Sequence, residues 1–242
     1  MTQKFLLVHG AWQGQWAWKN VAKTLKNEGH EVLAIDLPGS GNSHQPASQI
    51  TLAAYAEAIV ASAKALSSKG DVILVGHSMG GAAVTAAASI SPLLFAKIIY
   101  VCAFLPQDGE SVAMLGEESK RYGTAGPQTN IDKENGTLTL DSASIKHTFF
   151  NDYTGEQVEH FIEQFRPQPL TPLITPIALT PAWHNISKAY IVCQRDNAIS
   201  PKLQRLMAQR ANIHEIEYLD AGHEPFFSCP DKLTSVLIAQ GT

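Results

Sequence analysis

The serine at position 78 is the side chain whose surroundings most clearly suggest chemistry. It lies in the segment Gly76–Gly81, with a glycine two residues before it and another two residues after it, directly behind the apolar run 72–75. This is the pattern of a nucleophile elbow, a strand-to-helix turn so tight that the flanking positions need almost no side chain. With 17 glycines in 242 residues, composition alone produces the pattern in roughly 8% of such chains. Ser78 therefore needs partners elsewhere in the sequence to be assigned as a nucleophile.

A serine nucleophile needs a base within hydrogen-bond reach and an acid that orients the base. His223 follows the expected strand 213–219, and Asp196 follows the expected strand 189–192. Because loops at the carboxyl ends of parallel strands converge on one edge of a sheet, we expect these side chains to meet there. The chain order serine, acid, histidine is also the order expected for this kind of elbow. We therefore predict a catalytic triad of Ser78, Asp196 and His223.

Several other side chains compete for these roles. Asp108 follows the expected strand 98–101 and is the rival acid. His9 also ends a strand, but the small residues behind it favour a role in shaping the loop. His77 lies inside the elbow and is expected to point away from Ser78, and Asp36 is expected to bond backbone N–H groups of its own loop. The remaining histidines lack a strand-end position beside an acid and are expected to be packed or solvated: His30, His44, His147, His160, His184 and His214.

A tetrahedral intermediate formed on Ser78 would carry an oxyanion that needs two hydrogen-bond donors. The backbone N–H of Met79 follows the nucleophile directly and is the first candidate. The second must come from the loop behind the first strand, where Gly10 and Ala11 are small enough to let the main chain approach. We predict that the Ala11 N–H supplies it.

The elements that must position these groups alternate along the first half of the chain. Continuous apolar runs separated by helical stretches indicate an α/β protein with a doubly wound, mostly parallel sheet covered on both faces. Strands are expected at 5–8, 32–35, 72–75 and 98–101, and helices at 18–28, 51–66 and 79–89. The same rhythm returns late in the chain, with strands at 189–192 and 213–219 and helices at 201–209 and 231–239.

The rhythm breaks between about residues 105 and 187. Five prolines between 166 and 182 oppose a continuous helix or a central strand. A short helix is expected at 155–165. We interpret this stretch as a small cap inserted into one domain that spans 1–242. Disorder is the alternative, but apolar anchors oppose it: Phe149, Phe150, Phe161, Phe165 and Trp183.

Composition argues against several classes of function. Hydrophobic residues make up 45% and charged residues 17% of the chain, and the net charge is −4 with no basic cluster, so we expect no nucleic-acid partner and no membrane-surface role. No apolar stretch approaches the ~20 residues of a membrane span, and strand-like sequence from Phe5 leaves no room for a signal peptide. Cys102 and Cys193 lie in apolar runs far from Cys229, which favours unpaired thiols and a cytoplasmic location.

Taken together, these motifs make the chain resemble an α/β-hydrolase fold protein. It is more narrowly similar to the branch that contains plant methyl-ester esterases, (S)-selective hydroxynitrile lyases and bacterial esterase relatives. The resemblance spans almost the whole sequence. The segments that carry it are 9–12 with Gly14, Trp16 and Trp18; 29–32 leading to Asp36 and Leu37; 75–81; 103–106; 190–193 with Asp196; and Gly222 with His223.

The resemblance implies that Ser78, Asp196 and His223 form the triad of a serine hydrolase that cleaves small carboxylic esters, among them aromatic or methyl esters, without metal or cofactor. The lyases place a lysine after the histidine and a threonine in the first-strand loop, where this chain has Glu224 and Gly10. An acidic side chain there is expected to repel cyanide. The intact elbow argues against the cofactor-free dioxygenases, which replace or idle the serine.

Two alternatives stay open: carbon–carbon cleavage of the hydroxynitrile-lyase type, and a ligand-binding receptor of the same fold. The cap is rich in apolar side chains. They either bind a small apolar or aromatic ester or pack the cap on the sheet. We also expect a homodimer. The side chains expected to contact the substrate are Trp12, Phe104, Leu105, Phe149 and Trp183.

Overall fold

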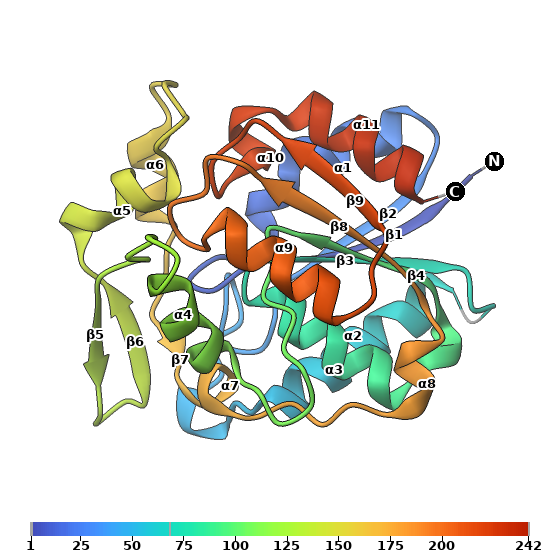
Figure 1. The fold of residues 1–242 in the computed structure, drawn as a ribbon, viewed down its shortest axis with the longest axis horizontal. Coiled ribbons are helices and arrows are strands. Elements are labelled where there is room, and N and C mark those ends of the chain that lie inside the picture. The colour runs from blue at the N-terminus through green and yellow to red at the C-terminus, as the bar shows by residue number, and fades with distance from the viewer. Residues whose placement is uncertain (1, 68, 242) are drawn as a thin grey trace.

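A six-stranded parallel sheet forms the centre of the computed structural model, which describes residues 2–67 and 69–241. The strands run in the order β2-β1-β3-β4-β8-β9, and each neighbouring pair is parallel. Figure 1 shows the sheet passing through the middle of the molecule. Its strands are β1 (Lys4–Val8), β2 (Glu31–Ile35), β3 (Val72–His77), β4 (Phe95–Val101), β8 (Ser187–Cys193) and β9 (Glu215–Leu219).

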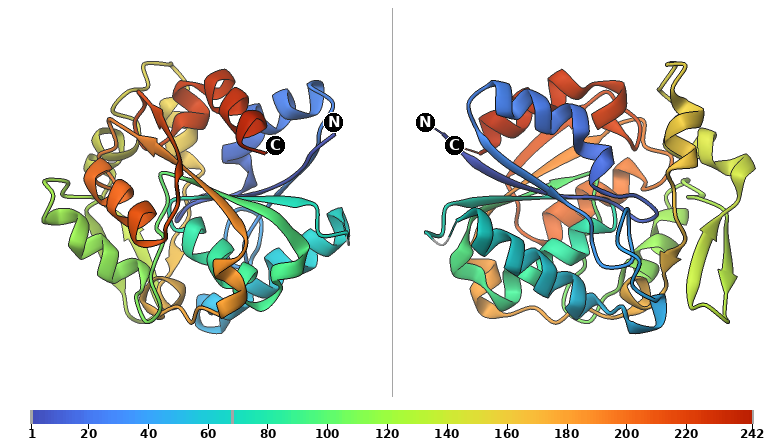
Figure 2. Two further views of the ribbon diagram at one scale, coloured as in Figure 1. Left: turned by 45° about the vertical axis from the view of Figure 1, so that its right-hand side comes forward. Right: turned by 180° about the vertical axis from the view of Figure 1, so that it is seen from behind.

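Helices cover both faces of this sheet, as the continuous apolar strands require. α1 (Lys19–Asn27) packs beside α11 (Pro230–Gln240) on one face, and α2 (Leu52–Leu66) packs beside α3 (Gly80–Ile90) on the other (Figures 1 and 2). The Thr51 side chain caps α2 by accepting from the Ala54 N–H, as its N-cap position predicts. The other elements around the sheet are α9 (Pro201–Arg210), α10 (Pro225–Ser228) and the 3₁₀ turns η1 (Gln15–Trp18), η2 (Ala47–Gln49) and η3 (Pro92–Leu94).

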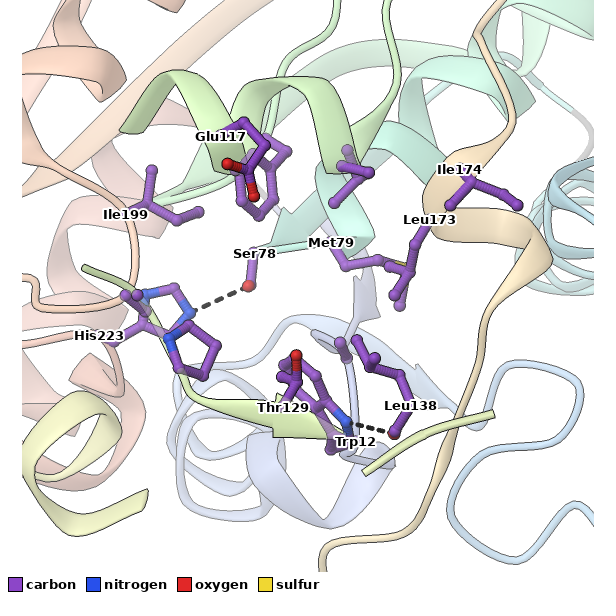
Figure 3. A pocket seen from close by; sticks show the side chains of 18 of the residues that line it. Trp12, Ser78, Met79, Glu117, Thr129, Leu138, Leu173, Ile174, Ile199 and His223 are labelled. Atoms are coloured by element: carbon purple, nitrogen blue, oxygen red, sulfur yellow. Dashed lines mark hydrogen bonds between the residues drawn. The ribbon is translucent and has the colours of Figure 1, made fainter. Parts of the chain in front are cut away.

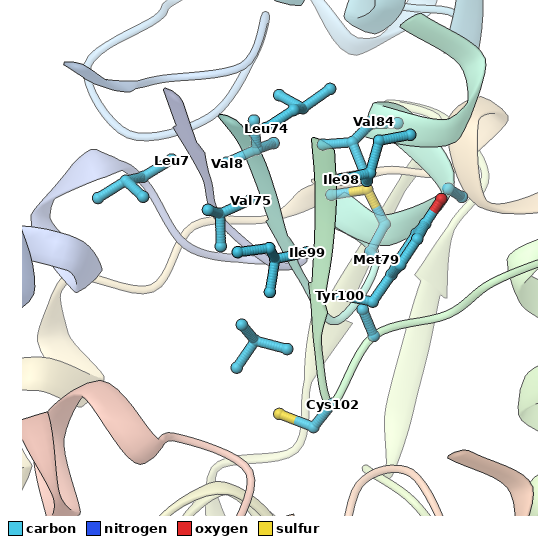
Figure 4. Close-up of a cluster of buried hydrophobic side chains, with 14 of the residues drawn as sticks. Leu7, Val8, Leu74, Val75, Met79, Val84, Ile98, Ile99, Tyr100 and Cys102 are labelled. Atoms are coloured by element: carbon cyan, nitrogen blue, oxygen red, sulfur yellow. The ribbon is translucent and has the colours of Figure 1, made fainter. Parts of the chain in front are cut away.

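The central strands contribute the core that holds the elbow in place. In the cluster of Figure 4, Leu74 and Val75 of β3 are fully buried, as are Ile98 and Ile99 of β4. Full burial of each such side chain contributes ~1.5–3 kcal/mol to folding. Strand β3, which precedes Ser78, is therefore packed on both faces, and this packing fixes the position of the turn that follows it.

Most of the stretch between β4 and β8 lies over the carboxyl ends of the strands, and its last helix, α8 (Pro181–His184), leads to the amino end of β8. The stretch contains a three-stranded antiparallel sheet in the order β5-β6-β7, which projects from the side of the molecule in Figure 1. We call residues 105–187 the cap. Its elements are α4 (Val112–Lys120), β5 (Thr129–Asp132), β6 (Thr137–Leu140), α5 (Ser142–Phe149), α6 (Val158–Glu163), β7 (Gln168–Pro169), α7 (Thr171–Ile174) and α8 (Pro181–His184).

The doubly wound parallel sheet expected from the sequence is confirmed, and the core strands and helices lie within a few residues of their expected positions. The cap was less well predicted. The helix expected at 155–165 is shorter, at Val158–Glu163, and the hairpin of β5 and β6 was missed. Both hairpin strands are only four residues long and are partly or fully exposed, and in β5 only Ile131 is apolar. Their pattern is therefore too short to mark a hairpin in the sequence.

Two further sequence expectations concern features outside the sheet. Cys102, Cys193 and Cys229 are free thiols, and the first two are buried, as predicted. Within the part of the chain that the structure describes, no helix combines the length and apolar character needed to cross a bilayer.

Candidate active site

Ser78 lies in a strained turn between β3 and α3. Its backbone has a positive φ of 53°, which is uncommon for a residue with a side chain. The turn is tight because the chain packs on itself: a Cβ at Gly76 would lie 2.9 Å from the carbonyl oxygen of Gly80, and a Cβ at Gly80 would lie 2.5 Å from that of His9. The glycine spacing seen in the sequence is therefore a steric requirement of this turn.

Replacing Gly80 by alanine should destabilise the protein. The new methyl group would meet backbone, which cannot move aside as a flexible side chain can, so we expect the free energy of unfolding to fall by ~1–3 kcal/mol. Urea denaturation measures this directly. Gly116→Ala is the matched control, since its Cβ meets nothing within 4 Å in helix α4, and we expect it to gain ~0.5–1 kcal/mol. A Gly80→Ala variant as stable as the wild type would contradict the steric account.

The side chains of Ser78, His223 and Asp196 form one continuous hydrogen-bond chain. Nε2 of His223 lies 2.9 Å from Oγ of Ser78, and Nδ1 lies 2.8 Å from Oδ2 of Asp196. Figure 3 shows the serine and the histidine facing each other across the mouth of a cavity. Because an ionised carboxylate only accepts, the ring proton belongs on Nδ1, and Nε2 is free to accept the serine proton. The structure thus brings together the three side chains that strand-end reasoning singled out.

The carboxylate of Asp196 is also held by hydrogen bonds other than the one to His223. Its Oδ1 accepts from the N–H groups of Ala198 (2.7 Å) and Ile199 (2.9 Å), and its Oδ2 also accepts from Nε2 of Gln204 at 2.8 Å. The Gln204 amide is itself fixed, since its oxygen accepts from the Cys193 N–H at 3.0 Å. Gln204 was not among the residues singled out from the sequence. The only sequence signal was a polar residue on the inner face of an expected helix.

The side chains that compete for the triad roles form hydrogen bonds with backbone groups and not with Ser78. Asp108 is exposed, and its Oδ1 accepts from the Leu179 N–H at 2.8 Å. Asp36 accepts from the N–H groups of Gln15 (2.6 Å) and Asn42 (3.2 Å), a structural role close to the predicted one. His77 turns away from Ser78, and its Nε2 lies 2.8 Å from the carbonyl oxygen of His223.

The pKa values of the two neighbouring histidines are shifted in opposite directions. Burial lowers the pKa of His223, but the charge of Asp196 and its hydrogen bond outweigh this, and the pKa is raised from 6.5. Burial and the nearby His223 hold the pKa of His77 well below 6.5, so His77 is neutral. Of the two, only His223 has an environment that favours accepting a proton.

Two backbone N–H groups beside Ser78 lack a hydrogen-bond acceptor in the protein. Within residues 2–67 and 69–241, the N–H of Ala11 and the N–H of Met79 have no protein acceptor. Both residues line the cavity beside Ser78. A buried N–H without a partner is costly, and an anion between these two groups would satisfy both. Both groups were named from the sequence as oxyanion donors, and that role stays a prediction.

The cavity above Ser78 has a volume of about 320 Å³ and is lined mostly by apolar side chains. Of the five predicted contact residues, Trp12, Phe104 and Phe149 line it. The cap closes over it: Nε1 of Trp12 donates to the carbonyl oxygen of Leu138 in β6 at 2.8 Å (Figure 3). The cap also reaches the histidine loop, where Oδ2 of Asp152 accepts from the Gly222 N–H at 2.6 Å.

The prediction was wrong for Leu105 and Trp183, which do not line this cavity. Leu105 is fully buried, with its N–H against Sδ of Met207 at 3.3 Å. Trp183 belongs to α8, directly before β8, and therefore lies at the amino end of the sheet, opposite the cavity. Sequence position could not separate these roles, because a buried aromatic residue in a cap and one in a core look alike. Leu138, Leu173 and Ile199 line the cavity and were missed.

Most donor atoms of one group of possible metal ligands among the described residues are engaged in hydrogen bonds. His77, Cys102 and His223 bring their donor atoms within 4.8 Å of one another. However, both ring nitrogens of His223 are bonded to Ser78 and Asp196, and Nε2 of His77 bonds a carbonyl oxygen. This group therefore does not offer a free set of donors to an ion.

Comparisons with known proteins show what this chain is similar to in sequence and fold. A family model described as the alpha/beta hydrolase family matches residues 5–236. Methylesterase 9 of Arabidopsis thaliana is 29% identical over 248 residues, which covers 97% of this chain and 96% of the relative. The crystal structure of polyneuridine aldehyde esterase superposes over the full length of both chains with a TM-score of 0.88 and 21% identity. A methylesterase structure from Arabidopsis has a TM-score of 0.83, 25% identity and 98% coverage of each chain.

Proposed function

Because the chain belongs to the alpha/beta hydrolase family, we propose that it is a carboxylic ester hydrolase with Ser78 as nucleophile, His223 as base and Asp196 as the acid that orients the base. The observation that carries the proposal is the unbroken hydrogen-bond chain from Oγ of Ser78 to Oδ2 of Asp196, beneath an apolar cavity. The full-length relatives named methylesterases support the same chemistry.

The proposed reaction has two steps, acylation of Ser78 and hydrolysis of the acyl-enzyme. Oγ of Ser78 attacks the ester carbonyl carbon while its proton moves to Nε2 of His223, and the new oxyanion accepts from the N–H groups of Ala11 and Met79. The C–O bond to the alcohol then breaks, and the departing oxygen takes the proton from His223. Water, giving a proton to the same nitrogen, attacks the acyl carbon. The acid leaves, and the proton returns to Ser78.

The substrates that best fit this site are small esters with an apolar or aromatic part, methyl esters among them. The apolar lining of the cavity supports this class, because it offers few polar groups to recognise a charged substrate. The test is a panel of p-nitrophenyl esters and aromatic methyl esters. We expect turnover within this panel, and a protein that hydrolyses none of them would contradict the proposal.

The alternative of a lyase has less support. No lysine follows His223, the position where the resemblance places the group that handles cyanide. Contrary to the expectation from the sequence, Glu224 does not line the cavity, and burial raises the pKa of its carboxyl to about 8. Glu224 therefore does not repel cyanide as a fixed charge facing the substrate. Cyanide release from mandelonitrile would favour the lyase, and tight binding of an ester without turnover would favour a receptor.

The rate of hydrolysis should depend on pH through His223. Since the base must be neutral, kcat/KM should rise with pH and level off above the pKa of His223, which Asp196 raises from 6.5. The measurement is a kcat/KM profile across the neutral range with an activated ester. A midpoint below 6.5 or a flat profile would show that another group acts as the base.

A cytoplasmic location and a homodimer stay predictions. The three free thiols suit a reducing compartment. Cell fractionation and light scattering of the purified protein test these two predictions.

A further inference from the structure

Glu224, the residue after His223, is buried and lies outside the lining of the cavity. It is 1% exposed. The charged groups around it are His223, Asp196 and Asp152. Burial raises the pKa of Glu224 to about 8, so the carboxyl is mostly a neutral acid at pH 7. The proposed reaction does not use this group, yet it lies beside the base.

The partner of this carboxyl is the amide of Gln13, which is equally buried. Nε2 of Gln13 lies 2.8 Å from each oxygen of Glu224, and Oε1 of Gln13 accepts from the Gly10 N–H at 3.1 Å. The backbone N–H can only donate, so the amide oxygen must face Gly10 and the NH₂ group must face Glu224. One side chain thus connects the histidine loop to the loop behind β1.

Gly10 occupies a critical place in that loop. A Cβ on it would lie 2.9 Å from Cβ of Ser78, so its backbone runs directly against the nucleophile. Its carbonyl oxygen is held by Nδ1 of His9 at 2.7 Å, while the Leu37 N–H donates to Nε2 of the same ring. Since a trans peptide points its N–H opposite its C=O, fixing the Gly10 carbonyl aims the Ala11 N–H.

We propose that Gln13 and Glu224 are positioning residues: the Gln13 amide, braced by Glu224, holds the Gly10 N–H and so fixes the oxyanion donor of Ala11. This inference rests on the proposed function. In this proposal Glu224 affects transition-state stabilisation through Gln13 and does not contact the substrate. Two loops that are far apart in sequence would then be fixed to each other at the place where the oxyanion forms.

The test compares Gln13→Met, Glu224→Met and the double variant, because methionine keeps the side-chain length and removes only the polar groups. At pH 7 we expect kcat for p-nitrophenyl acetate to fall ~10- to 100-fold, less than the loss of a whole donor, with KM changed by no more than about twofold. Trifluoroacetophenone, which forms a tetrahedral adduct on serine, should bind more weakly by a similar factor. The double variant should lose little more than Gln13→Met alone, because both act through one contact.

Two control variants separate positioning from stability. Glu224→Gln should restore most of kcat at pH 7, because an amide closely resembles the neutral acid. Thr234→Val removes a hydrogen bond within α11, a helix that contributes no residue to the cavity, and should lower the melting temperature without changing kcat.

The proposal is overturned if the methionine variants only lower the melting temperature, or if they raise KM while kcat and inhibitor affinity stay unchanged. It is also overturned if the two single losses simply add. Failure of the proposed function would give a different result: the Ser78→Ala variant would hydrolyse esters as fast as the wild type.

Discussion

The Ser78→Ala variant should lose ester hydrolysis by roughly 10⁶-fold in kcat, the loss seen when the nucleophile of such a triad is removed. Oγ of Ser78 is the atom that faces Nε2 of His223 at 2.9 Å, and the alanine methyl group cannot attack a carbonyl carbon. Residual activity would come from the oxyanion donors and from binding alone. The measurement is turnover of the ester panel by wild type and variant in parallel.

The fold should survive this substitution, because the side chain of Ser78 is small and alanine differs from it by one hydroxyl group. Ser89→Ala is the matched control: Ser89 is a buried serine of the adjoining helix α3, and its hydroxyl has no hydrogen-bond partner. We expect that variant to keep full activity, and both variants to keep the circular dichroism spectrum of the wild type. Unchanged hydrolysis by Ser78→Ala would exclude Ser78 as the nucleophile.

Replacing Asp196 by asparagine should lower kcat by about 10⁴-fold, since an amide NH₂ facing Nδ1 favours the tautomer whose Nε2 carries the proton. That tautomer points a hydrogen at Oγ of Ser78 and cannot act as base. The loss of the negative charge should also lower the pKa of His223, because Asp196 is the group that raises it. Steady-state kinetics and the pH profile of the variant measure both effects.

Asp108→Asn is the control that decides between the two candidate acids. Asp108 is exposed, and asparagine keeps an oxygen that can accept from the Leu179 N–H. We expect kcat to change by no more than about twofold, as for a surface substitution away from the chemistry. A larger loss from Asp108→Asn than from Asp196→Asn would overturn the assignment of the acid.

The parts of the molecule that could be predicted from the sequence are those that depend on local patterns. Apolar runs separated by helical stretches specify strands buried on both faces, and β1, β3 and β4 follow them closely. The glycines around Ser78 reflect a clash within a few residues of chain and with the adjacent strand-end loop, so their spacing is visible in sequence. Parallel strands end at one edge, which was enough to single out Asp196 and His223.

Only the tertiary structure determined which side chains meet across long distances in the chain. The hairpin of β5 and β6 was missed because its strands are only four residues long, too short for their pattern to stand out in the sequence. Leu105 and Trp183 were misplaced because apolar residues serve a core or a cavity equally well. The contact of Gln13 with Glu224 joins loops separated by almost the whole chain. Such contacts arise from the packing of the finished fold, because local patterns specify elements and not the distances between them.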